Sequence, residues 1–226
     1  MCGRFTQQRP TAELAELFEA EPAPAELEPR YNLAPTDEAA VVVERGDRRA
    51  IRAYRWGLIP SWAKDERIAS KLFNARAETL DTSGAFRDSF RKRRCIVPAD
   101  AFYEWQRTDG QRRPFLIHRS DGAPLALAGL WSGWHHPETD QVVRSFTIIT
   151  TTANQTLSSV HDRMPVVLER RDWKRWLDTT NSDLGELEAL LQPAPDDELE
   201  LYPVRPLVNN VRNEGPELIE RADRTA

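Results

Sequence analysis

Residues 102–119 read FYEWQRTDGQRRPFLIHR, and this stretch decides the fold class. Two runs rich in aromatic and aliphatic residues, 102–107 and 114–119, flank the segment Thr108-Asp109-Gly110-Gln111. An Asp-Gly pair between two such runs is typical of a tight β-hairpin turn. The sequence therefore predicts two antiparallel strands joined by a short turn.

Further strands are predicted on both sides of this hairpin, with a few short helices among them. The predicted strands cover residues 41–44, 50–56, 125–134, 142–150, 164–168 and 199–204, and Cys95 falls in a further apolar strand. The predicted helices are 11–18, capped by Thr11, a short one around Phe86 and Phe90, then 154–160, 173–177 and 184–191. No repeat or linker divides the chain. We expect one α+β domain over residues 1–226, with a strongly curved, barrel-like mixed or antiparallel sheet, a few short flanking helices and a loosely held tail from about residue 214.

Composition limits the class of protein. The chain has 226 residues, a formal net charge of −5, 40% hydrophobic and 30% charged residues, which is typical of a soluble globular domain. Two cysteines are too few for a disulfide-stapled secreted module. No apolar run approaches the ~20 residues that span a bilayer, and the N-terminus has no signal-peptide layout. A soluble intracellular protein without a membrane partner is expected.

The charge is unevenly distributed along the chain. Residues 51–165 hold seventeen Lys and Arg against twelve Asp and Glu, whereas the segments on either side are net negative. The acidic total argues against indiscriminate nucleic-acid binding, but a phosphate-binding surface needs only a local positive field. Basic runs such as 91–94 and 112–113 are equally consistent with solvated faces. Charge alone therefore does not decide the function.

Cys2 is the residue with the most distinctive chemistry. A small side chain at this position allows the initiator methionine to be removed, which would leave a free α-amine and a thiol on adjacent carbons. With reference pKa values of ~7.7–8.0 and ~8.5, both groups have a nucleophilic fraction near neutral pH. Such a pair can trap an aldehyde as a thiazolidine, or the cysteine can serve as the nucleophile of an N-terminal hydrolase. The alternative is that Cys2 is an incidental small residue.

Three other polar residues are candidates for chemistry beside Cys2. His161 precedes an acid and an arginine in a segment predicted as a loop. Glu104 interrupts a run of aromatic residues, a setting that prepares a carboxyl group for proton transfer, although strict strand alternation would turn it outward. Asn74 opens the polar segment Asn74-Ala75-Arg76-Ala77-Glu78-Thr79. No zinc spacing, glycine-rich phosphate loop or nucleotide fingerprint is present, so neither a metal nor a cofactor is expected.

Seven segments in order along the chain resemble the SRAP (SOS response-associated peptidase) family, the abasic-site processing proteins. The segments that carry the resemblance are Met1-Cys2-Gly3-Arg4-Phe5, Tyr31-Asn32-Leu33-Ala34-Pro35, Trp56-Gly57-Leu58-Ile59-Pro60, Asn74 to Thr79, Pro98 to Trp105, His161-Asp162-Arg163-Met164-Pro165 and Asn209-Asn210-Val211-Arg212. Any one of them is a weak signal, but seven in family order over nearly the whole chain are highly specific.

The resemblance implies a protein that recognises abasic sites in single-stranded DNA and crosslinks to them. It implies that Cys2 is the nucleophile and that Glu104 is the acid and base for opening the sugar ring. It also implies that His161 assists by hydrogen-bonding the sugar or the imine, and that Asn74 positions the N-terminal residue or the sugar. It implies that arginines grip the flanking phosphates and that three further residues pack against bases. The arginines are Arg4, Arg76 and Arg163, and the packing residues are Pro35, Trp62 and Trp105.

Three functions remain open at this stage. A covalent crosslinker would gain the mass of DNA only when an abasic aldehyde is present. A cysteine peptidase or autoprocessing hydrolase would use Cys2 to turn over a peptide, and a non-catalytic single-strand binder would not need Cys2. For the first, we expect a monomer whose partner is abasic single-stranded DNA, without metal or cofactor. It would be cytoplasmic and nucleoid-associated in a bacterium, or nuclear in a eukaryote.

Overall fold

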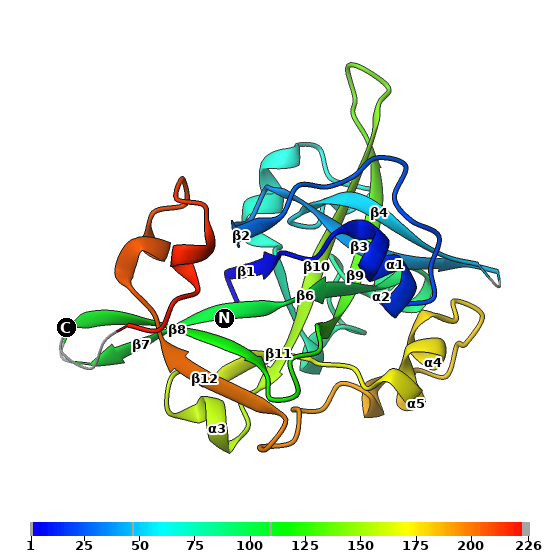
Figure 1. Ribbon diagram of the computed structural model, residues 1–226. Helices are drawn as coiled ribbons and strands as arrows, with labels where there is room; N and C mark the ends of the chain where they lie inside the picture. The colour runs from blue at the N-terminus through cyan, green and yellow to red at the C-terminus, as the bar shows by residue number, and fades with distance from the viewer. Residues whose placement is uncertain (1, 47, 109, 223–226) are drawn as a thin grey trace.

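Five long strands of the chain close into a barrel. The computed structural model describes residues 2–46, 48–108 and 110–222, and its strands form two sheets (Figure 1). In the larger sheet the order β10-β4-β3-β6-β9 is completed by pairing of β9 with β10, which closes the ring. The β4–β10 pair is parallel and the others are antiparallel, so the barrel is mixed. The strands are β3 (Glu38–Arg45), β4 (Arg48–Trp56), β6 (Arg94–Ala99), β9 (Leu125–His135) and β10 (Val142–Thr152). The predicted fold class is confirmed.

A second, antiparallel sheet holds the predicted hairpin and the N-terminal strand. Its order is β12-β8-β7-β1-β2. These strands are β1 (Arg4–Gln7), β2 (Arg30–Leu33), β7 (Ala101–Thr108), β8 (Gln111–Arg119) and β12 (Leu199–Pro203). Two short strands, β5 (Asn74–Arg76) and β11 (Arg163–Pro165), both pair with β10. Strand β10 therefore connects the barrel to two segments that carry candidate site residues.

Alternation along the barrel strands divides the core between two apolar clusters. On β3, Val41 and Val43 belong to a cluster that also contains Cys2, whereas Val42 belongs to the cluster covered by helices. Successive side chains of a strand point to opposite faces, so one strand serves both clusters. The helices are α1 (Thr11–Leu17), α2 (Arg87–Lys92), α3 (Gln155–Ser158), α4 (Trp173–Leu177) and α5 (Leu184–Ala189). Figure 1 shows α1, α2, α4 and α5 together on one side of the barrel.

Most predicted elements are present, with two local differences. Helix α1 begins at Thr11 without a side-chain cap, because the Thr11 hydroxyl donates instead to Glu26 at 2.6 Å. The strand predicted at 164–168 is limited to β11, and beyond it only Val167 bridges to Leu127. The turn residues Asp47 and Asp109 lie outside the described residues.

The C-terminal segment is held more firmly than the sequence suggests. Leu218 is fully buried, and the backbone N–H of Ala222 donates to the Pro203 carbonyl at 2.8 Å. Glu214 forms an ion pair with Arg30 at 2.8 Å and accepts a hydrogen bond from the backbone of Tyr31. The expectation of a loose tail is therefore wrong for residues 214–222, and residues 223–226 lie outside the described part.

One member of the basic run 91–94 is a structural residue. The Arg94 side chain is fully buried, and its guanidinium lies over the Trp176 ring, 5.8 Å from the centroid. It donates to the carbonyl oxygens of Phe90, Arg91, Trp176, Asp178 and Asn181. Burial lowers the pKa of Arg94 to about 10, which still leaves the group charged at neutral pH. Arg94 thus ties α2 and α4 to the barrel strand β6.

We predict that Arg94→Leu lowers the free energy of unfolding by about 3–5 kcal/mol, because several buried carbonyls lose their charged donor. Urea unfolding measures this loss. The control is Arg91→Leu, which removes an exposed partner of Asp81 and should cost no more than about 1 kcal/mol. Equal stability of the two variants would contradict the role of Arg94.

Candidate active site

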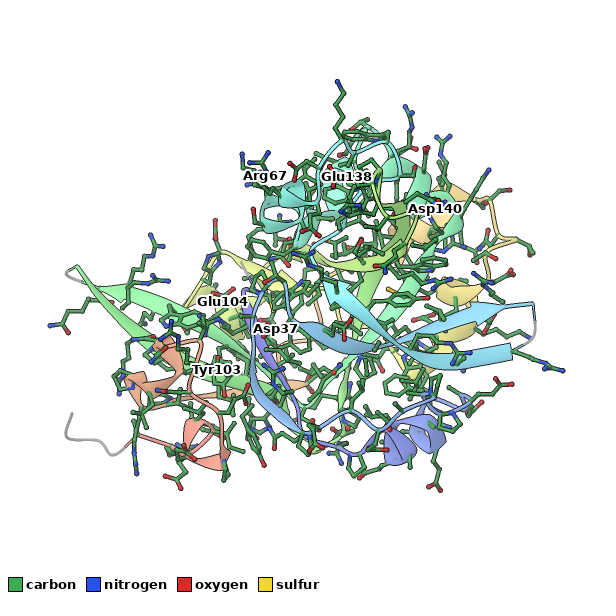
Figure 2. All side chains as sticks on the ribbon, turned by 90° about the horizontal axis from the view of Figure 1, so that it is seen from above. Asp37, Arg67, Tyr103, Glu104, Glu138 and Asp140 are labelled. Atoms are coloured by element: carbon green, nitrogen blue, oxygen red, sulfur yellow. The ribbon has the colours of Figure 1, made fainter. Side chains whose placement is uncertain are left out.

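The second sheet brings the N-terminus of the chain to Glu104. Strand β1 lies between β2 and β7, with Arg4 opposite Tyr103 and Phe5 opposite Phe102. Continuing this antiparallel register by one residue places Gly3 opposite Glu104. Figure 2 shows Tyr103 and Glu104 on β7, alongside the N-terminal strand. Pairing of β1 with β7 therefore fixes the distance between Cys2 and the candidate carboxylate.

Cys2 is held from two directions. Its backbone carbonyl accepts a hydrogen bond from Asn74 Nδ2 at 2.7 Å, and its thiol lies 3.9 Å from the Arg4 carbonyl oxygen, a weak contact. The side chain is fully buried in the core cluster that also contains Phe102. Burial raises the pKa of the Cys2 thiol, and the negative charge of nearby Glu104 raises that pKa further. At neutral pH the thiol is therefore protonated.

Glu104 is buried rather than turned outward. Only 2% of its surface is exposed, and its neighbour Tyr103 on the opposite face of β7 is fully buried. Both faces of β7 are covered, since Phe102 packs in the cluster of Cys2 and Tyr103 packs against Val204 and Val208 of the C-terminal segment. The alternative interpretation of Glu104 as a solvated strand residue is therefore wrong.

His161 lies in the turn between α3 and β11. Its Nδ1 is 2.9 Å from the backbone N–H of Arg163 and 2.8 Å from a carboxylate oxygen of Asp162. The two contacts require opposite states of the ring, because accepting from Arg163 needs a bare Nδ1 and donating to Asp162 needs a protonated one. In the neutral ring that accepts from Arg163, the proton is on Nε2, which makes Nε2 a donor.

The C-terminal segment orients Arg4 and Trp105. Arg4 donates to the Asn32 side chain at 2.8 Å and to the Val208 carbonyl at 2.9 Å, and its guanidinium lies 6.0 Å from the centroid of the Trp105 ring. The Trp105 indole N–H donates to Asn209 Oδ1 at 2.7 Å. Asn32 and Asn209 are therefore positioning residues for this pair, and both lie within segments that carry the family resemblance.

Arg76 and Arg163 lie on the two short strands that flank β10. Arg76 is exposed, and its register partner on β10 is Thr150. Arg163 forms two contacts with the Glu78 carboxylate, at 2.6 and 3.0 Å, and donates to the Thr150 carbonyl at 2.6 Å. The ion pair lowers the pKa of Glu78. The sequence places Glu78 within a motif but gives it no role, and the structure identifies it as the partner of Arg163.

The structure joins only some of the predicted site residues by direct contacts. Asn74 contacts Cys2, Arg4 contacts Trp105, and His161 contacts the backbone of Arg163. Glu104 is linked to Cys2 by the effect of its charge on the thiol. Three further residues, Arg76, Pro35 and Trp62, lie apart from these contacts. Pro35 is half-buried just after β2, and Trp62 is 59% exposed with its indole N–H 3.1 Å from the Gly84 carbonyl. Their contribution to DNA binding stays a prediction.

Metal sites and membrane spans are both absent from the part of the chain that the structure describes. Within residues 2–46, 48–108 and 110–222, no group of three His, Cys, Asp or Glu side chains is arranged to hold a metal ion. None of the helices in these ranges is long and apolar enough to cross a membrane.

Comparison with known proteins decides the family. The model of the family described as SOS response associated peptidase (SRAP) matches residues 1–211. This chain belongs to the SRAP family. It is 42% identical over 223 residues to the abasic site processing protein YoqW of Bacillus subtilis, covering 97% of this chain and 99% of that protein. It is 33% identical to the abasic site processing protein YedK of Escherichia coli, again covering 97% of this chain and 99% of that protein.

Solved structures of two other bacterial proteins are similar to this chain in fold. A crystal structure of a Bacteroides thetaiotaomicron protein matches with a TM-score of 0.88 at 24% identity, covering 98% of this chain and 100% of that one, which shows a shared fold. A Bordetella bronchiseptica protein matches with a TM-score of 0.78 at 28% identity, covering 90% of this chain and 100% of that one.

We predict that the two buried thiols make this SRAP protein less stable at alkaline pH. Burial raises the pKa of both Cys2 and Cys95 in the folded state, so the folded protein keeps protons that the unfolded chain releases above about pH 8.5. Their contribution to stability is fully present below that pH and is lost as the pH rises. The free energy of unfolding should fall by up to about 1.4 kcal/mol per pH unit for each thiol.

Urea unfolding between about pH 7.5 and 9.5, under reducing conditions, measures this slope. Cys95→Ala should remove one of the two thiol contributions and make the slope shallower. A free energy of unfolding that stays constant over this range in the unmodified chain would contradict the burial of the thiols.

Proposed function

We propose that this protein binds abasic sites in single-stranded DNA and traps them covalently through Cys2, after removal of Met1. The proposal rests on the surroundings of Cys2, which would become a 1,2-aminothiol once Met1 is removed. Asn74 holds the Cys2 carbonyl, and the negative charge of the buried Glu104 carboxylate acts on the Cys2 thiol. The relatives' names point to the same lesion, since YoqW and YedK are both called abasic site processing proteins.

The proposed chemistry is a condensation of an aminothiol with an aldehyde. An abasic deoxyribose opens to an aldehyde, and the Cys2 amine adds to its carbonyl carbon to give a carbinolamine. Loss of one water molecule gives an imine. The Cys2 sulfur then adds to the imine carbon, the S–H proton passes through a base to the nitrogen, and a five-membered thiazolidine ring closes. The product has the mass of the processed protein plus the DNA, less one water.

The residues around Cys2 suit these proton transfers. Glu104 is close enough for its charge to affect the Cys2 thiol, so its carboxylate is suited to open the sugar ring and to receive the S–H proton. Asn74 holds the Cys2 carbonyl through Nδ2, and its Oδ1 is buried without a hydrogen-bond partner among the described residues. That oxygen is available to accept from the new Cys2 amine or a sugar hydroxyl. His161 would donate through Nε2 to the sugar or imine.

The flanking residues suit single-stranded DNA. Arg4 and Arg76 would contact phosphates on either side of the lesion, and Arg163 would exchange its partner Glu78 for a phosphate. Trp62, Trp105 and Pro35 would pack against bases, where stacking on an aromatic ring contributes ~1–3 kcal/mol per base. We propose that one molecule acts alone on its DNA.

Peptide hydrolysis by Cys2 is the second candidate, and the family's description as a peptidase is what favours it. A peptidase needs a thiolate, because the thiolate and not the thiol is the nucleophile. Burial and the charge of Glu104 both raise the pKa of the Cys2 thiol, which disfavours that state. The condensation begins at the amine instead, so a protonated thiol does not prevent it.

We predict that Cys2→Ala abolishes the stable DNA adduct. The variant keeps an N-terminal amine, so it still forms an imine, which hydrolyses unless borohydride reduces it. Intact-mass analysis of the protein with an abasic oligonucleotide should show the adduct, less one water, for the unmodified chain and for the control Cys95→Ala, whose buried thiol lies in the core. Non-covalent binding of undamaged DNA should change by less than about twofold, because the arginines that contact phosphates remain.

Two outcomes would contradict this assignment. One is an equal yield of adduct from Cys2→Ala without borohydride. The other is an unmodified chain that retains Met1 in full and still forms the adduct.

We predict that Glu104→Gln slows adduct formation by about 10²-fold or more without changing the final adduct mass, because general acid and base catalysis is lost. Single-turnover crosslinking between about pH 6 and 8 measures the rate, and the exposed residue Glu188 on α5 provides the matched control Glu188→Gln. A Glu104→Gln rate equal to that of the control over this range would remove Glu104 from the mechanism.

A further inference from the structure

A basic hollow lies on the barrel outside the Cys2 site. It has a volume of about 800 Å³, and none of the predicted site residues lines it. Its walls come from β3, β4, the start of β10 and the segment that follows α1. The residues that bear charge are Glu21, Glu38, Arg45, Arg48, Arg52, Arg55 and Arg144. Five cations thus face two carboxylates.

Most of this positive charge is not neutralised by neighbouring side chains. Arg55 forms an ion pair with Glu66 at 2.6 Å, and Arg48 approaches Glu21 at 4.0 Å. In the described part of the chain, no carboxylate lies within 4.0 Å of the guanidinium groups of the other three arginines of the hollow. Arg45 also lies directly opposite Arg48 in the β3–β4 register, and like charges in that position destabilise a hairpin. The fold therefore maintains an arrangement that an anionic ligand would relieve.

The positive charge of three of the arginines acts on one buried phenol. Tyr54 lines the hollow and packs against Trp131, with ring centroids 5.6 Å apart. Burial raises the pKa of Tyr54, and the positive charges of Arg144, Arg45 and Arg52 act in the opposite direction. The three guanidinium groups, contributed by three different strands, are therefore all within electrostatic range of a single hydroxyl group. Arg45, Arg52 and Arg144 therefore contribute to one positive region at the wall of the hollow.

The length of the basic track indicates a ligand with several phosphates. Arg48 and Arg52 are four residues apart and on the same face of β4, which corresponds to ~13 Å at ~3.3 Å per residue. A single phosphate would contact only one end of such a track. Apolar side chains, including Leu27 and the 44% exposed Val142, form the rest of the wall and are suited to contact sugars.

We propose that this hollow binds the sugar-phosphate backbone of a nucleic acid strand, at a surface separate from Cys2, through Arg45, Arg48, Arg52 and Arg144. Binding there needs neither an abasic site nor the Cys2 amine, so the inference goes beyond the proposed function. Backbone contacts carry no sequence information, and the site would therefore hold undamaged DNA with a strong dependence on salt.

Fluorescence anisotropy with an undamaged oligothymidylate of about twenty nucleotides tests the proposal. In Arg52→Gln/Arg144→Gln, the affinity at low salt should fall about tenfold. The slope of log K against log salt should become shallower by about 0.7 for each phosphate that the variant no longer neutralises. In Arg52→Lys/Arg144→Lys, which keeps both charges, the affinity should stay within about twofold of the unmodified chain. Both positions lie at the surface or half-buried, and thermal unfolding would verify the fold of each variant.

The matched control is Arg171→Gln/Lys174→Gln, which removes the same charge from exposed residues outside the hollow. Equal binding by the hollow variant and this control would overturn the proposal. The proposal would also be overturned if the hollow variant lost binding of inorganic phosphate or polyglutamate but kept its binding of oligothymidylate. That result would identify a site for small anions or for an acidic protein instead. Covalent capture of a short abasic oligonucleotide should be unchanged in the hollow variant. A failure of capture in every variant would count against the proposed function alone.

Discussion

The pairing of β1 with β7 is the constraint on which the candidate site depends. Phe5 lies opposite Phe102 and is buried in the same cluster as Cys2, so the register is fixed by core packing as well as by backbone hydrogen bonds. A slip of one residue would turn every β1 side chain to the opposite face, taking Phe5 out of the core. It would also separate the Cys2 carbonyl from Asn74. The position of the N-terminus is therefore as well determined as that of a core strand.

The same sheet connects the two ends of the chain. Asn32 on β2 is buried and donates from Nδ2 to the carbonyls of Asn210 and Asn213, while its oxygen accepts from Arg4. One amide thus satisfies buried groups on the N-terminal strand and on the segment that follows β12. Leaving such groups unpaired would cost about 1–3 kcal/mol each, which explains why residues 206–213 pack here although β12 has already ended.

Elements with strong local signals can be predicted from the sequence. Elements that form only through contacts with distant parts of the chain cannot. The hairpin around residue 110 follows from turn chemistry and strand composition. Strands β1, β2 and β5 have three or four residues each, too few for a periodic pattern, and they exist because distant strands pair with them. Alternation misplaces Glu104 because it assumes that one face of β7 is solvated, whereas distant segments cover both faces.

Candidate residues follow the same division. Cys2 and Glu104 stand out because their chemistry is unusual for their local sequence. Partners such as Asn32 for Arg4 and Glu78 for Arg163 are 28 and 85 residues away in the chain, so no local pattern reveals them. The basic run 91–94 shows the reverse error, because a side chain that composition assigns to the surface or to phosphate binding is buried as a structural donor.

The burial of the Cys2 thiol is consistent with the proposed chemistry rather than opposed to it. An exposed low-pKa thiolate oxidises readily, whereas a buried, protonated thiol does not. On the proposed route the amine reacts first and the sulfur only closes the ring, so the thiol needs a base at that step and not before. Burial is the main cause of the raised pKa of the thiol, and the negative charge of Glu104 adds to it. On the proposed route, the Glu104 carboxylate would also take the proton. Burial and Glu104 together would thus keep the sulfur unreactive until an imine is present, and Glu104 would then allow it to react.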